Sequence, residues 1–445
     1  MSALRASLRV ANLYWDGDAF APKVEARDLE ALEERLDRLS GQFALALEGP
    51  AGSVVLARDK YGSNKLFFAV REDGTVDASN YVADLVDRGV PFDAVFSVPA
   101  GHFTVLDPAR RSLRTRRYHE LANGTPTDPS LRAIGRKIRT ALELWFERLK
   151  RQFSDREICL CLSGGLDSSL IAALACKYFD HVAGFTYSFV ADDHPESEDA
   201  AYARRVAAHL GIPVEFIPAT RDDILGVVLD AIVYGQDWRD FNVHCAIVNE
   251  IIGRHLAAHP AASGRRRLIL TGDMMNEIVA DYTPISYGGK DYYALPRVDI
   301  DQLRLILIKG LDAGDREIGV FHRHGLDAIQ PYGLVLDAYL DVTGPLLRGD
   351  APKQQLVREV GGDLLPGFVL GRKKVRAQIG TSERPTGILP TLVESGRDSA
   401  WLRQAWCRRF GIGEEAQLNR FIRAGCYRFP VVYPQGRAKL GYHVG

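Results

Sequence analysis

The sequence predicts an α/β protein in which a layered, β-rich N-terminal unit is followed by a larger α/β unit with a parallel sheet and additional helices. Before about residue 120, short apolar runs alternate with turn residues, whereas from residue 158 strand-like and helix-like segments alternate. The segment between these patterns is rich in proline, glycine and asparagine. We therefore expect a first domain over 1–120, a linker over 121–130 and a second domain over 131–445.

The elements of the first domain follow from its short apolar runs. Four such runs predict strands, and leucines at helical spacing predict one helix. The expected strands cover 41–47, 53–57, 65–70 and 102–106, and the expected helix covers 29–39.

The second domain is expected to open with a long amphipathic helix, because apolar residues recur there every three or four positions. These residues are Leu131, Ile134, Ile138, Leu142, Trp145 and Leu149. Strands are then expected at 158–162, 182–187, 214–217 and 268–270, and helices at 168–178 and 200–210. This alternation favours a parallel sheet with helices on both faces, followed from about residue 295 by a mostly helical remainder.

Composition narrows the function classes. The chain has 445 residues, of which 46% are hydrophobic, and this suffices for two or three ordinary domains. Its 56 Lys and Arg residues against 57 Asp and Glu residues give a net charge of −1, so no global field favours nucleic acid or a membrane as partner. Six unevenly spaced cysteines fit a reducing compartment, and no apolar run reaches the ~18 residues of a membrane span. We expect a cytoplasmic protein.

One short stretch, Ser163-Gly-Gly-Leu-Asp-Ser-Ser169, has the composition of a phosphate-binding turn. It follows the strand expected at 158–162, and ligands of open α/β sheets bind beyond the carboxyl ends of strands. Gly164 and Gly165 let the backbone approach an anion, and Ser163, Ser168 and Ser169 offer hydroxyl donors beside a helix N-terminus. No lysine follows the glycines, so the stretch is not a P-loop of the Gly-Lys-Ser/Thr type.

Asp167 is an anion placed among anion binders. It would repel phosphate unless a divalent cation joined them, and Mg²⁺ is the ion that phosphates and carboxylates share. The alternative is a serine-capped turn in which Asp167 only complements the helix dipole.

The whole string resembles the pyrophosphate loop of the ATP pyrophosphatase superfamily, and it is most similar to that of asparagine synthetases and β-lactam synthetases. The resemblance implies ATP and Mg²⁺ as cofactors. It also implies a reaction in which a substrate carboxylate attacks the α-phosphate of ATP, pyrophosphate leaves and an acyl-adenylate forms.

A second segment, Thr271-Gly-Asp-Met-Met-Asn-Glu277, is similar to the second active-site loop of that family. The resemblance implies that Gly272 lies at the nucleotide, that Asp273 is catalytic and that Asn276 lies at a metal position where relatives carry aspartate. The Gly-Ser of the family pattern is replaced here by Met274-Met275. Loop solvation or helix capping is the alternative role for Asp273.

A third segment, Arg372-Lys-Lys374, resembles the family's Arg-x-Lys sequence, which places Lys374 at the position of the catalytic lysine. A fixed cation there would stabilise the tetrahedral intermediate and the leaving AMP. Glu317 lies where β-lactam synthetases carry a catalytic glutamate. The alternatives are a solvated basic face for 372–376 and a surface helix for Glu317.

The first domain resembles class II glutamine amidotransferase domains, which have αββα layers. The similar strings begin at Gly41 and Ala57 and end with Ala78-Ser-Asn80. Those domains use an N-terminal cysteine as nucleophile, whereas no cysteine precedes Cys159 here. We expect a degenerate domain without glutaminase activity, with Ser2 as a replacement nucleophile the alternative.

These observations predict an ATP-dependent amide-forming ligase that adenylates a carboxylate and transfers the acyl group to an amine without glutamine hydrolysis, in natural-product biosynthesis. The substrates are expected to be a small-molecule or peptide carboxylate and amine, joined within one molecule as a lactam or macrolactam or between two. An ammonia-dependent amidating enzyme, a non-catalytic scaffold and an RNA-modifying relative are the alternatives. The oligomeric state stays open, a homodimer included.

Overall fold

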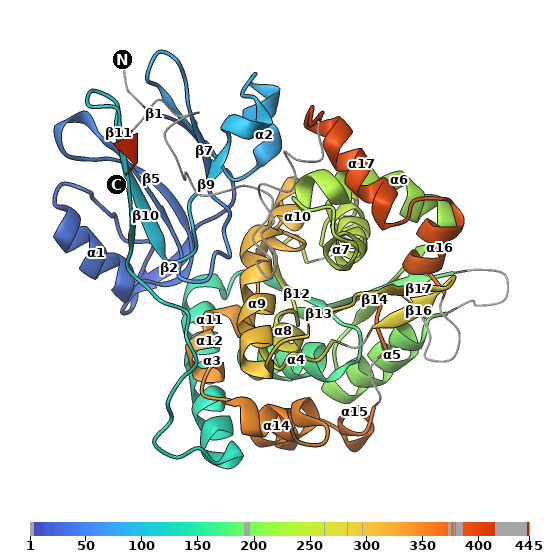
Figure 1. Cartoon of the computed structure of the whole chain (residues 1–445). Coiled ribbons are helices and arrows are strands. Elements are labelled where there is room, and N and C mark those ends of the chain that lie inside the picture. The colour runs from blue at the N-terminus through green and yellow to red at the C-terminus, as the bar shows by residue number, and fades with distance from the viewer. Residues whose placement is uncertain are drawn as a thin grey trace.

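The computed structural model describes residues 4–190, 196–261, 263–282, 284–295, 297–372, 375–377, 379, 386–413 and 443–444. Layered N-terminal strands lie beside a parallel sheet that helices surround (Figure 1). The predicted α/β class is confirmed. The domain boundaries at 120 and 131 stay a prediction.

The first 120 residues contain most of the strands and two short helices. In chain order these elements are β1 (Leu4–Ser7), β2 (Leu13–Asp16), β3 (Ala19–Phe20), α1 (Leu29–Arg38), β4 (Ser40–Gln42), β5 (Ala44–Glu48), β6 (Val54–Arg58), β7 (Phe67–Val70), β8 (Val76–Ser79), α2 (Val82–Asp87), β9 (Phe96–Ser97), β10 (His102–Asp107) and β11 (Ser112–Arg117).

The rest of the described chain is mainly helical around a five-stranded sheet, with a second sheet of two short strands. Its elements are α3 (Leu131–Phe153), β12 (Glu157–Cys161), α4 (Leu166–Tyr178), β13 (Val182–Phe189), α5 (Glu198–Leu210), β14 (Val214–Ala219), α6 (Arg221–Tyr234), α7 (Asp240–Ala258), β15 (Arg267–Leu270), α8 (Met275–Ile278), β16 (Ile285–Tyr287), β17 (Lys290–Tyr292), α9 (Ile300–Ala313), α10 (Ile318–Arg323), β18 (Asp327–Ile329), α11 (Pro331–Leu334), α12 (Leu336–Tyr339), α13 (Gly344–Leu347), α14 (Pro352–Gly361), α15 (Gly367–Leu370), α16 (Ile388–Glu394), α17 (Ser399–Arg409) and β19 (His443–Val444).

Two sheets stack in the N-terminal part, one in the order β19-β11-β10-β6-β5 and the other in the order β1-β8-β7-β9. Alternation along β6 builds the layers, because successive side chains of a strand point to opposite faces. Val54 and Leu56 pack between the two sheets, whereas Val55 and Ala57 pack against α1. On the outer face of the second sheet, β7 packs with α2 and with helices of the second part. The expected layered αββα arrangement is therefore present.

The second part is built on a sheet with the order β14-β13-β12-β15-β18, in which all neighbouring strands are parallel. The strand order reverses between β12 and β15. In open α/β sheets such a reversal opens a crevice at the carboxyl ends of the two strands, which is the usual ligand site. Here the turn 163–165 follows β12, and the loop 271–274 follows β15.

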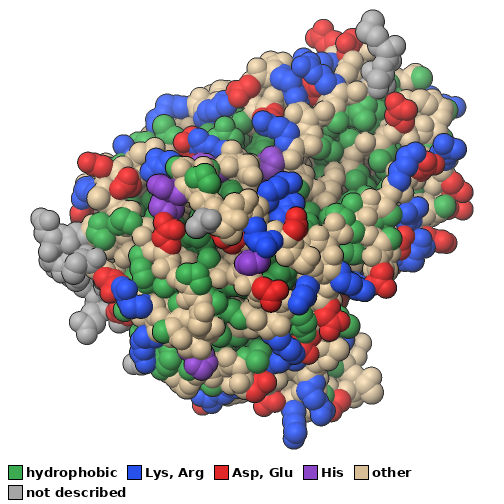
Figure 2. Space-filling view, turned by 180° about the vertical axis from the view of Figure 1, so that it is seen from behind, with side chains coloured by type: hydrophobic (Ala, Val, Ile, Leu, Met, Phe, Trp, Pro, Cys, Tyr) green, Lys and Arg blue, Asp and Glu red, His purple; other side chains and the backbone are tan. Residues whose placement is uncertain are grey.

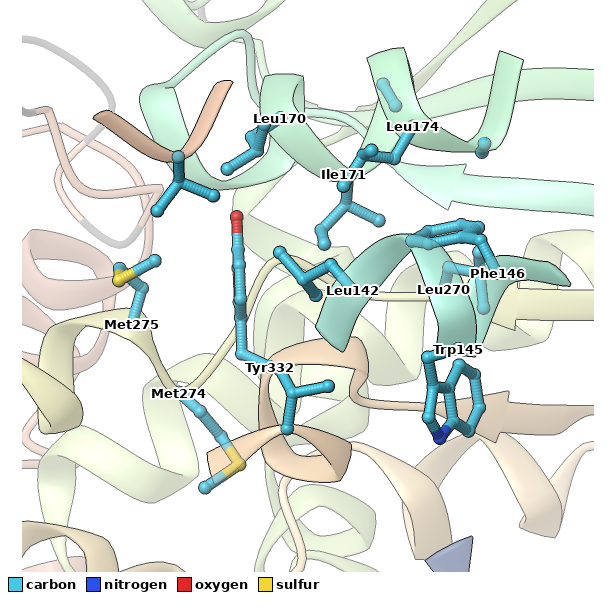
Figure 3. Close-up of a cluster of buried hydrophobic side chains, with 14 of the residues drawn as sticks. Leu142, Trp145, Phe146, Leu170, Ile171, Leu174, Leu270, Met274, Met275 and Tyr332 are labelled. Carbon is cyan, nitrogen blue, oxygen red and sulfur yellow. The ribbon is translucent and has the colours of Figure 1, made fainter. Parts of the chain in front are cut away.

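A large hydrophobic core supports both of these loops from one side (Figure 3). Trp145 and Phe146 of α3 pack in the same cluster as Leu170 of α4, and all three are at most 4% exposed. Met274 and Met275, which depart from the family pattern, are buried in this cluster as well. The two methionines thus anchor the loop after β15 in the core.

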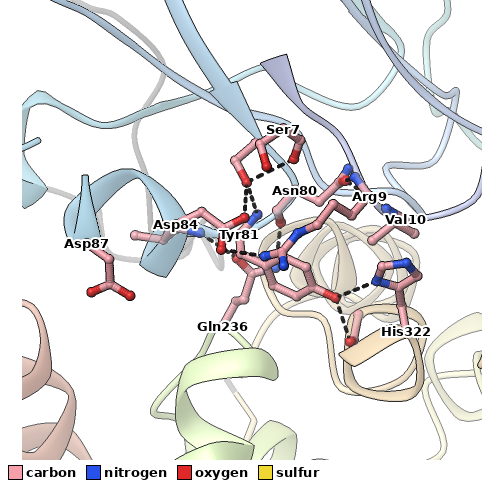
Figure 4. A network of polar contacts seen from close by, with 12 residues as sticks. Ser7, Arg9, Val10, Asn80, Tyr81, Asp84, Asp87, Gln236 and His322 are labelled. Carbon is pink, nitrogen blue, oxygen red and sulfur yellow. Dashed lines mark hydrogen bonds and ion pairs between the residues drawn. The ribbon is translucent and has the colours of Figure 1, made fainter. Parts of the chain in front are cut away.

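Hydrogen bonds join the N-terminal layers to the second part (Figure 4). The Tyr81 hydroxyl donates to the carbonyl oxygen of Gly319 at 2.8 Å and contacts His322 Nδ1 at 3.2 Å. The Gln236 side chain accepts from Val82 N and donates to the carbonyl oxygen of Asn80, both at 3.0 Å. Further along the same boundary, Lys65 Nζ donates to the carbonyl oxygen of Leu311 at 2.9 Å.

The surface carries charges of both signs. In Figure 2, Lys and Arg side chains are interspersed with Asp and Glu side chains over the visible face, in keeping with a net charge of −1. Within the described ranges, no helix is long and apolar enough to cross a membrane.

Asp59 provides a test of the N-terminal layers. Its fully buried carboxylate accepts from the backbone N–H groups of Phe43, Tyr61, Ser63 and Asn64 at 2.9–3.2 Å. The substitution Asp59→Ala leaves these donors without their acceptor, and we expect the free energy of unfolding to fall by more than about 2 kcal/mol.

Chemical denaturation followed by tryptophan fluorescence measures this loss. Glu34→Ala, on the exposed face of α1, is the control and should change the free energy of unfolding by less than about 0.5 kcal/mol. Equal stability of the two variants would contradict the role given to Asp59.

Candidate active site

One cleft opens at the reversal point of the parallel sheet. Its walls are formed by the turn after β12, the loop after β15, the middle of β13, helix α7 and the segment around Arg372. The sequence analysis chose residues from the turn after β12, the loop after β15 and the segment around Arg372, and the structure brings the first two together. The predicted residues that line the cleft are Ser163, Gly165, Asp167, Ser168, Gly272, Asp273 and Asn276.

The turn after β12 is closed by its own side chains. Ser168 Oγ accepts from Ser163 N at 3.2 Å, and Ser163 Oγ accepts from Gly165 N at 3.3 Å. Gly164 has φ +70°, and a Cβ there would lie 2.6 Å from Ala203 N, so only glycine fits. Helix α4 begins directly after Gly165, which directs its first N–H groups and its positive dipole end at the cleft.

The loop after β15 lies directly against this turn. A Cβ on Gly272 would lie 2.7 Å from Ser168 N and 2.8 Å from Ser168 Cα. The absence of a side chain at residue 272 therefore lets the two loops touch. The next turn is made by Met274 at φ +81°, a conformation that favours glycine, and burial of its side chain holds it there.

A lysine ammonium lies where the two loops meet. Lys353, at the start of α14, is 7% exposed, and its Nζ contacts Asp167 Oδ2. The same Nζ donates to Asn276 Oδ1 at 2.7 Å and lies 4.0 Å from Asp281 Oδ2. A buried cation and several oxygen ligands therefore face each other beside the phosphate-type turn.

Arg372 braces the turn from the opposite side. It donates from Nη1 to the carbonyl oxygen of Ser163 at 2.8 Å and from Nη2 to Asp199 Oδ1 at 2.6 Å. Its guanidinium also lies 4.1 Å from the centroid of the Tyr202 ring. Burial raises the pKa of Asp199 to about 6, although the charge of Arg372 opposes that rise.

A second polar cluster forms the end of the cleft near Asp273. Arg316 is 3% exposed, and its Nη2 lies 3.6 Å from Asp273 Oδ1 and 2.7 Å from Glu277 Oε1. Its Nε lies 3.3 Å from Glu317 Oε1. Burial, reinforced by the carboxylate of Asp273, raises the pKa of Glu317 well above its usual range.

Three predicted residues lie off the cleft wall. Ser169 is fully buried in α4. Gly164 allows the backbone of the turn to pack closely against Ala203, and it does not line the cleft. Glu317 lies beneath the wall, where its Oε2 accepts from Thr271 Oγ1 at 2.9 Å and from Gln330 Nε2 at 2.6 Å. The alternative of a surface position for Glu317 does not hold, because its side chain is 1% exposed. Lys374 lies outside the described residues.

Sequence reasoning did not assign four charged residues that the structure places at the cleft. These are Lys353, Arg372, Asp281 and Arg316. Arg372 stood in the segment that resembles the family's Arg-x-Lys sequence. Arg316 directly precedes the candidate Glu317, so this neighbour was the available signal for it.

Comparison with known proteins finds similar sequences that include both loops of the cleft. The asparagine synthase family matches residues 147–287, which span β12 to β16 and both cleft loops. Asparagine synthetase of Rattus norvegicus is 28% identical over 416 residues, covering 85% of this chain and 71% of the rat enzyme. That of Homo sapiens is 33% identical over 207 residues, covering 41% of this chain and 36% of the human enzyme.

Among solved structures, the chain matches the NMN synthetase of Francisella tularensis, at 14% identity and a TM-score of 0.31. That alignment covers 64% of this chain and 95% of the synthetase. Both values are low, so the assignment rests on the sequence matches. They place the chain among the ATP-dependent carbon–nitrogen ligases that form AMP and pyrophosphate. Within that class, residues 147–287 match the asparagine synthase family, and the chain is similar to asparagine synthetases.

Gly272 tests the contact between the two loops. In Gly272→Ala the new methyl group would overlap the backbone of Ser168, so the loops must separate. We expect a loss of about 1–3 kcal/mol in the free energy of unfolding and weaker ATP binding, measured by denaturation and calorimetry.

The matched control is Gly226→Ala, in α6, where an added Cβ meets no atom within 4 Å. Alanine is the better helix former by about 1 kcal/mol, so this variant should be as stable as the wild type or more stable. Unaltered ATP binding by Gly272→Ala would show that the loops do not depend on their contact.

Asp199 gives a pH-dependent prediction. Folding raises the pKa of this carboxyl from 3.8 to about 6, so between these values the folded protein binds more protons than the unfolded chain. This carboxyl therefore makes the free energy of unfolding fall as pH rises through that window. Asp199→Asn does not titrate, so the stability of wild type relative to Asp199→Asn should decrease as pH rises from about 4 to about 6.

Thermal unfolding midpoints of the two proteins across that range check this slope. Asp155→Asn, whose side chain is 79% exposed, serves as the control for general pH effects. A stability difference independent of pH would contradict the raised pKa of Asp199.

Proposed function

We propose that the protein is a glutamine-independent amide synthetase. It adenylates a substrate carboxylate with ATP and transfers the acyl group to an amine, in natural-product biosynthesis. The observation that carries the proposal is the meeting of a phosphate-type turn, a buried lysine and a carboxylate–arginine cluster in one cleft.

The first step takes place at the turn after β12. The N–H groups at the start of α4 and the hydroxyl groups of Ser163 and Ser168 would hold the β- and γ-phosphates of ATP. The substrate carboxylate attacks the α-phosphate, a carboxylate–phosphorus bond forms and pyrophosphate leaves. Lys353 offsets the negative charge on that leaving group.

The oxygen ligands around Lys353 suit Mg²⁺ that is shared with phosphates. Mg²⁺ is usually bound by one or two carboxylates together with substrate phosphates, and Asp167 and Asp281 supply two carboxylates beside the amide oxygen of Asn276. Within the described part of the chain, no three Asp, Glu, His or Cys side chains form a metal cluster, so the phosphates would complete the ligand set. When bound, the ion would supply positive charge to the phosphates.

The second step takes place at the other end of the cleft. The amine nitrogen attacks the acyl carbon, an amide bond forms and the bond to AMP breaks. Asp273 would take the proton from the amine, and the 31% exposure of its side chain to the cleft supports this role. We assign Lys374 the role of the cation that stabilises the tetrahedral intermediate, from its place in the sequence motif.

Glutamine independence is supported by the N-terminal domain. No cysteine precedes Cys159 in the sequence. Asn80, in a motif shared with amidotransferases, accepts from Arg9 N at 2.7 Å and Val10 N at 3.0 Å, and it donates to the carbonyl oxygen of Lys65 at 2.8 Å. The side chain of Asn80 therefore binds other segments of the chain, which supports a structural role rather than a role in binding glutamine.

The experiment incubates the purified protein with ATP, Mg²⁺ and amino-acid-like carboxylates, with an added amine, ammonia, glutamine or none. Pyrophosphate, AMP and product mass are measured. Loss of water from a single substrate identifies an intramolecular lactam, and a requirement for a second amine identifies an intermolecular ligase. Equal activity with glutamine as the sole nitrogen source would overturn glutamine independence.

The variants Asp167→Ala and Lys374→Ala test the assigned roles. Each removes one charge from the reaction path, and we expect pyrophosphate release to fall by at least about 100-fold with folding intact. Lys309→Ala, on the exposed face of α9, is the matched control and should retain the wild-type rate. Wild-type rates in the two site variants would refute these assignments.

A further inference from the structure

The Arg316 side chain carries a donor, Nη1, that has no partner among the residues that the structure describes. Arg316 uses Nε for Glu317 and Nη2 for Glu277, yet no described atom accepts a hydrogen bond from its Nη1. The side chain is 3% exposed and lines the cleft. Because a buried donor is costly to leave unpaired, this geometry favours a ligand atom that accepts from Nη1.

The surrounding charges restrict that ligand. The carboxyl groups of Asp273 and Glu277 lie 3.6 Å and 2.7 Å from Nη2 of Arg316, and that of Glu317 lies 3.3 Å from its Nε, so three carboxyl groups already share one guanidinium. A ligand carboxylate at Nη1 would add a further negative charge in a poorly solvated place. A neutral carbonyl oxygen accepts the same hydrogen bond without adding charge.

Asp273 supplies the second point of recognition. Its side chain is 31% exposed, whereas those of Glu277 and Glu317 are 1% exposed, so Asp273 is the accessible carboxylate of the cluster. A protonated amine is favoured beside it. Asp273 Oδ1 lies 3.6 Å from Arg316 Nη2. An amine and the carbonyl group next to it can therefore reach both side chains.

We propose that this end of the cleft binds an amine whose neighbouring carbonyl is neutral, as in an α-amino amide or the amino terminus of a peptide. Arg316 Nη1 donates to the carbonyl oxygen, and Asp273 binds the ammonium group before it loses its proton. The inference rests on the proposed function, because this amine is the group that attacks the acyl-adenylate. It deepens that function by excluding free amino acids as preferred acceptors.

The test measures acceptor binding to the full-length protein saturated with Mg²⁺ and α,β-methylene ATP. The probes are glycinamide, glycine and ethylamine. The binding of each probe is measured by saturation-transfer NMR. Glycinamide should bind at least about 10-fold more tightly than either of the others, which corresponds to one good hydrogen bond or one avoided like charge. This comparison needs no variant.

Arg316→Lys keeps the positive charge but replaces three donor nitrogens by a single ammonium nitrogen, so no donor remains at the position of Nη1. It should lower glycinamide affinity to that of ethylamine and leave ethylamine affinity unchanged. Arg323→Lys is the matched control, because Arg323 also pairs with a buried glutamate, Glu250, through Nη1 at 2.6 Å. It should retain the preference for glycinamide.

Two outcomes would overturn the inference alone: glycine binding as tightly as glycinamide, or ethylamine doing so, in protein that binds the nucleotide. Failure to bind α,β-methylene ATP in the presence of Mg²⁺ is a different result. It would overturn the proposed function and with it this inference.

Discussion

The site depends on one close contact, in which the loop after β15 rests on the turn after β12. A Cβ on Gly272 would lie 2.7 Å from Ser168 N, so the approach is as close as the backbone allows. This contact brings Asp273 and Asn276 to the same cleft as Asp167. The parallel neighbours β12 and β15 fix the distance, and the buried side chains of Met274 and Met275 hold the loop in place.

The contact divides the cleft into two ends with different chemistry. At one end, helix α4, Lys353 and Arg372 would offer positive charge to the phosphates of ATP. At the other, Asp273 and Glu277 outnumber Arg316, which suits an amine. A carboxylate activated at the first end and an amine held at the second would meet at the acyl carbon. The proposed order of adenylation and acyl transfer follows from this separation of charge.

Much of the architecture could be predicted from the sequence. Helix α3 begins at Leu131, as its apolar spacing indicates, and the strands around the cleft lie where alternation predicted them. The expected strand 41–47 is instead divided into β4 and β5, which belong to different sheets. Strand β18, of three residues, was missed because it is too short to show a period in a region of helices.

The candidate site was predicted less completely, because its contacts join segments far apart in sequence. Glycine-rich and acidic motifs revealed the two loops, but nothing local shows that Lys353 reaches Asp167 or that Arg316 reaches Asp273. Burial also raises the pKa of Glu317, and burial is a property of the folded chain that a local motif does not show. The roles of Asp273, Glu317, Asn276 and Lys374 stay proposals.

The most direct measurement of the central claim is phosphorus NMR of ATP turnover by the protein with Mg²⁺ and a carboxylate substrate. Adenylation at the cleft predicts AMP and pyrophosphate in equal amounts, with no ADP. Formation of ADP and inorganic phosphate would contradict the claim, because it would place the attack on the γ-phosphate rather than on the α-phosphate.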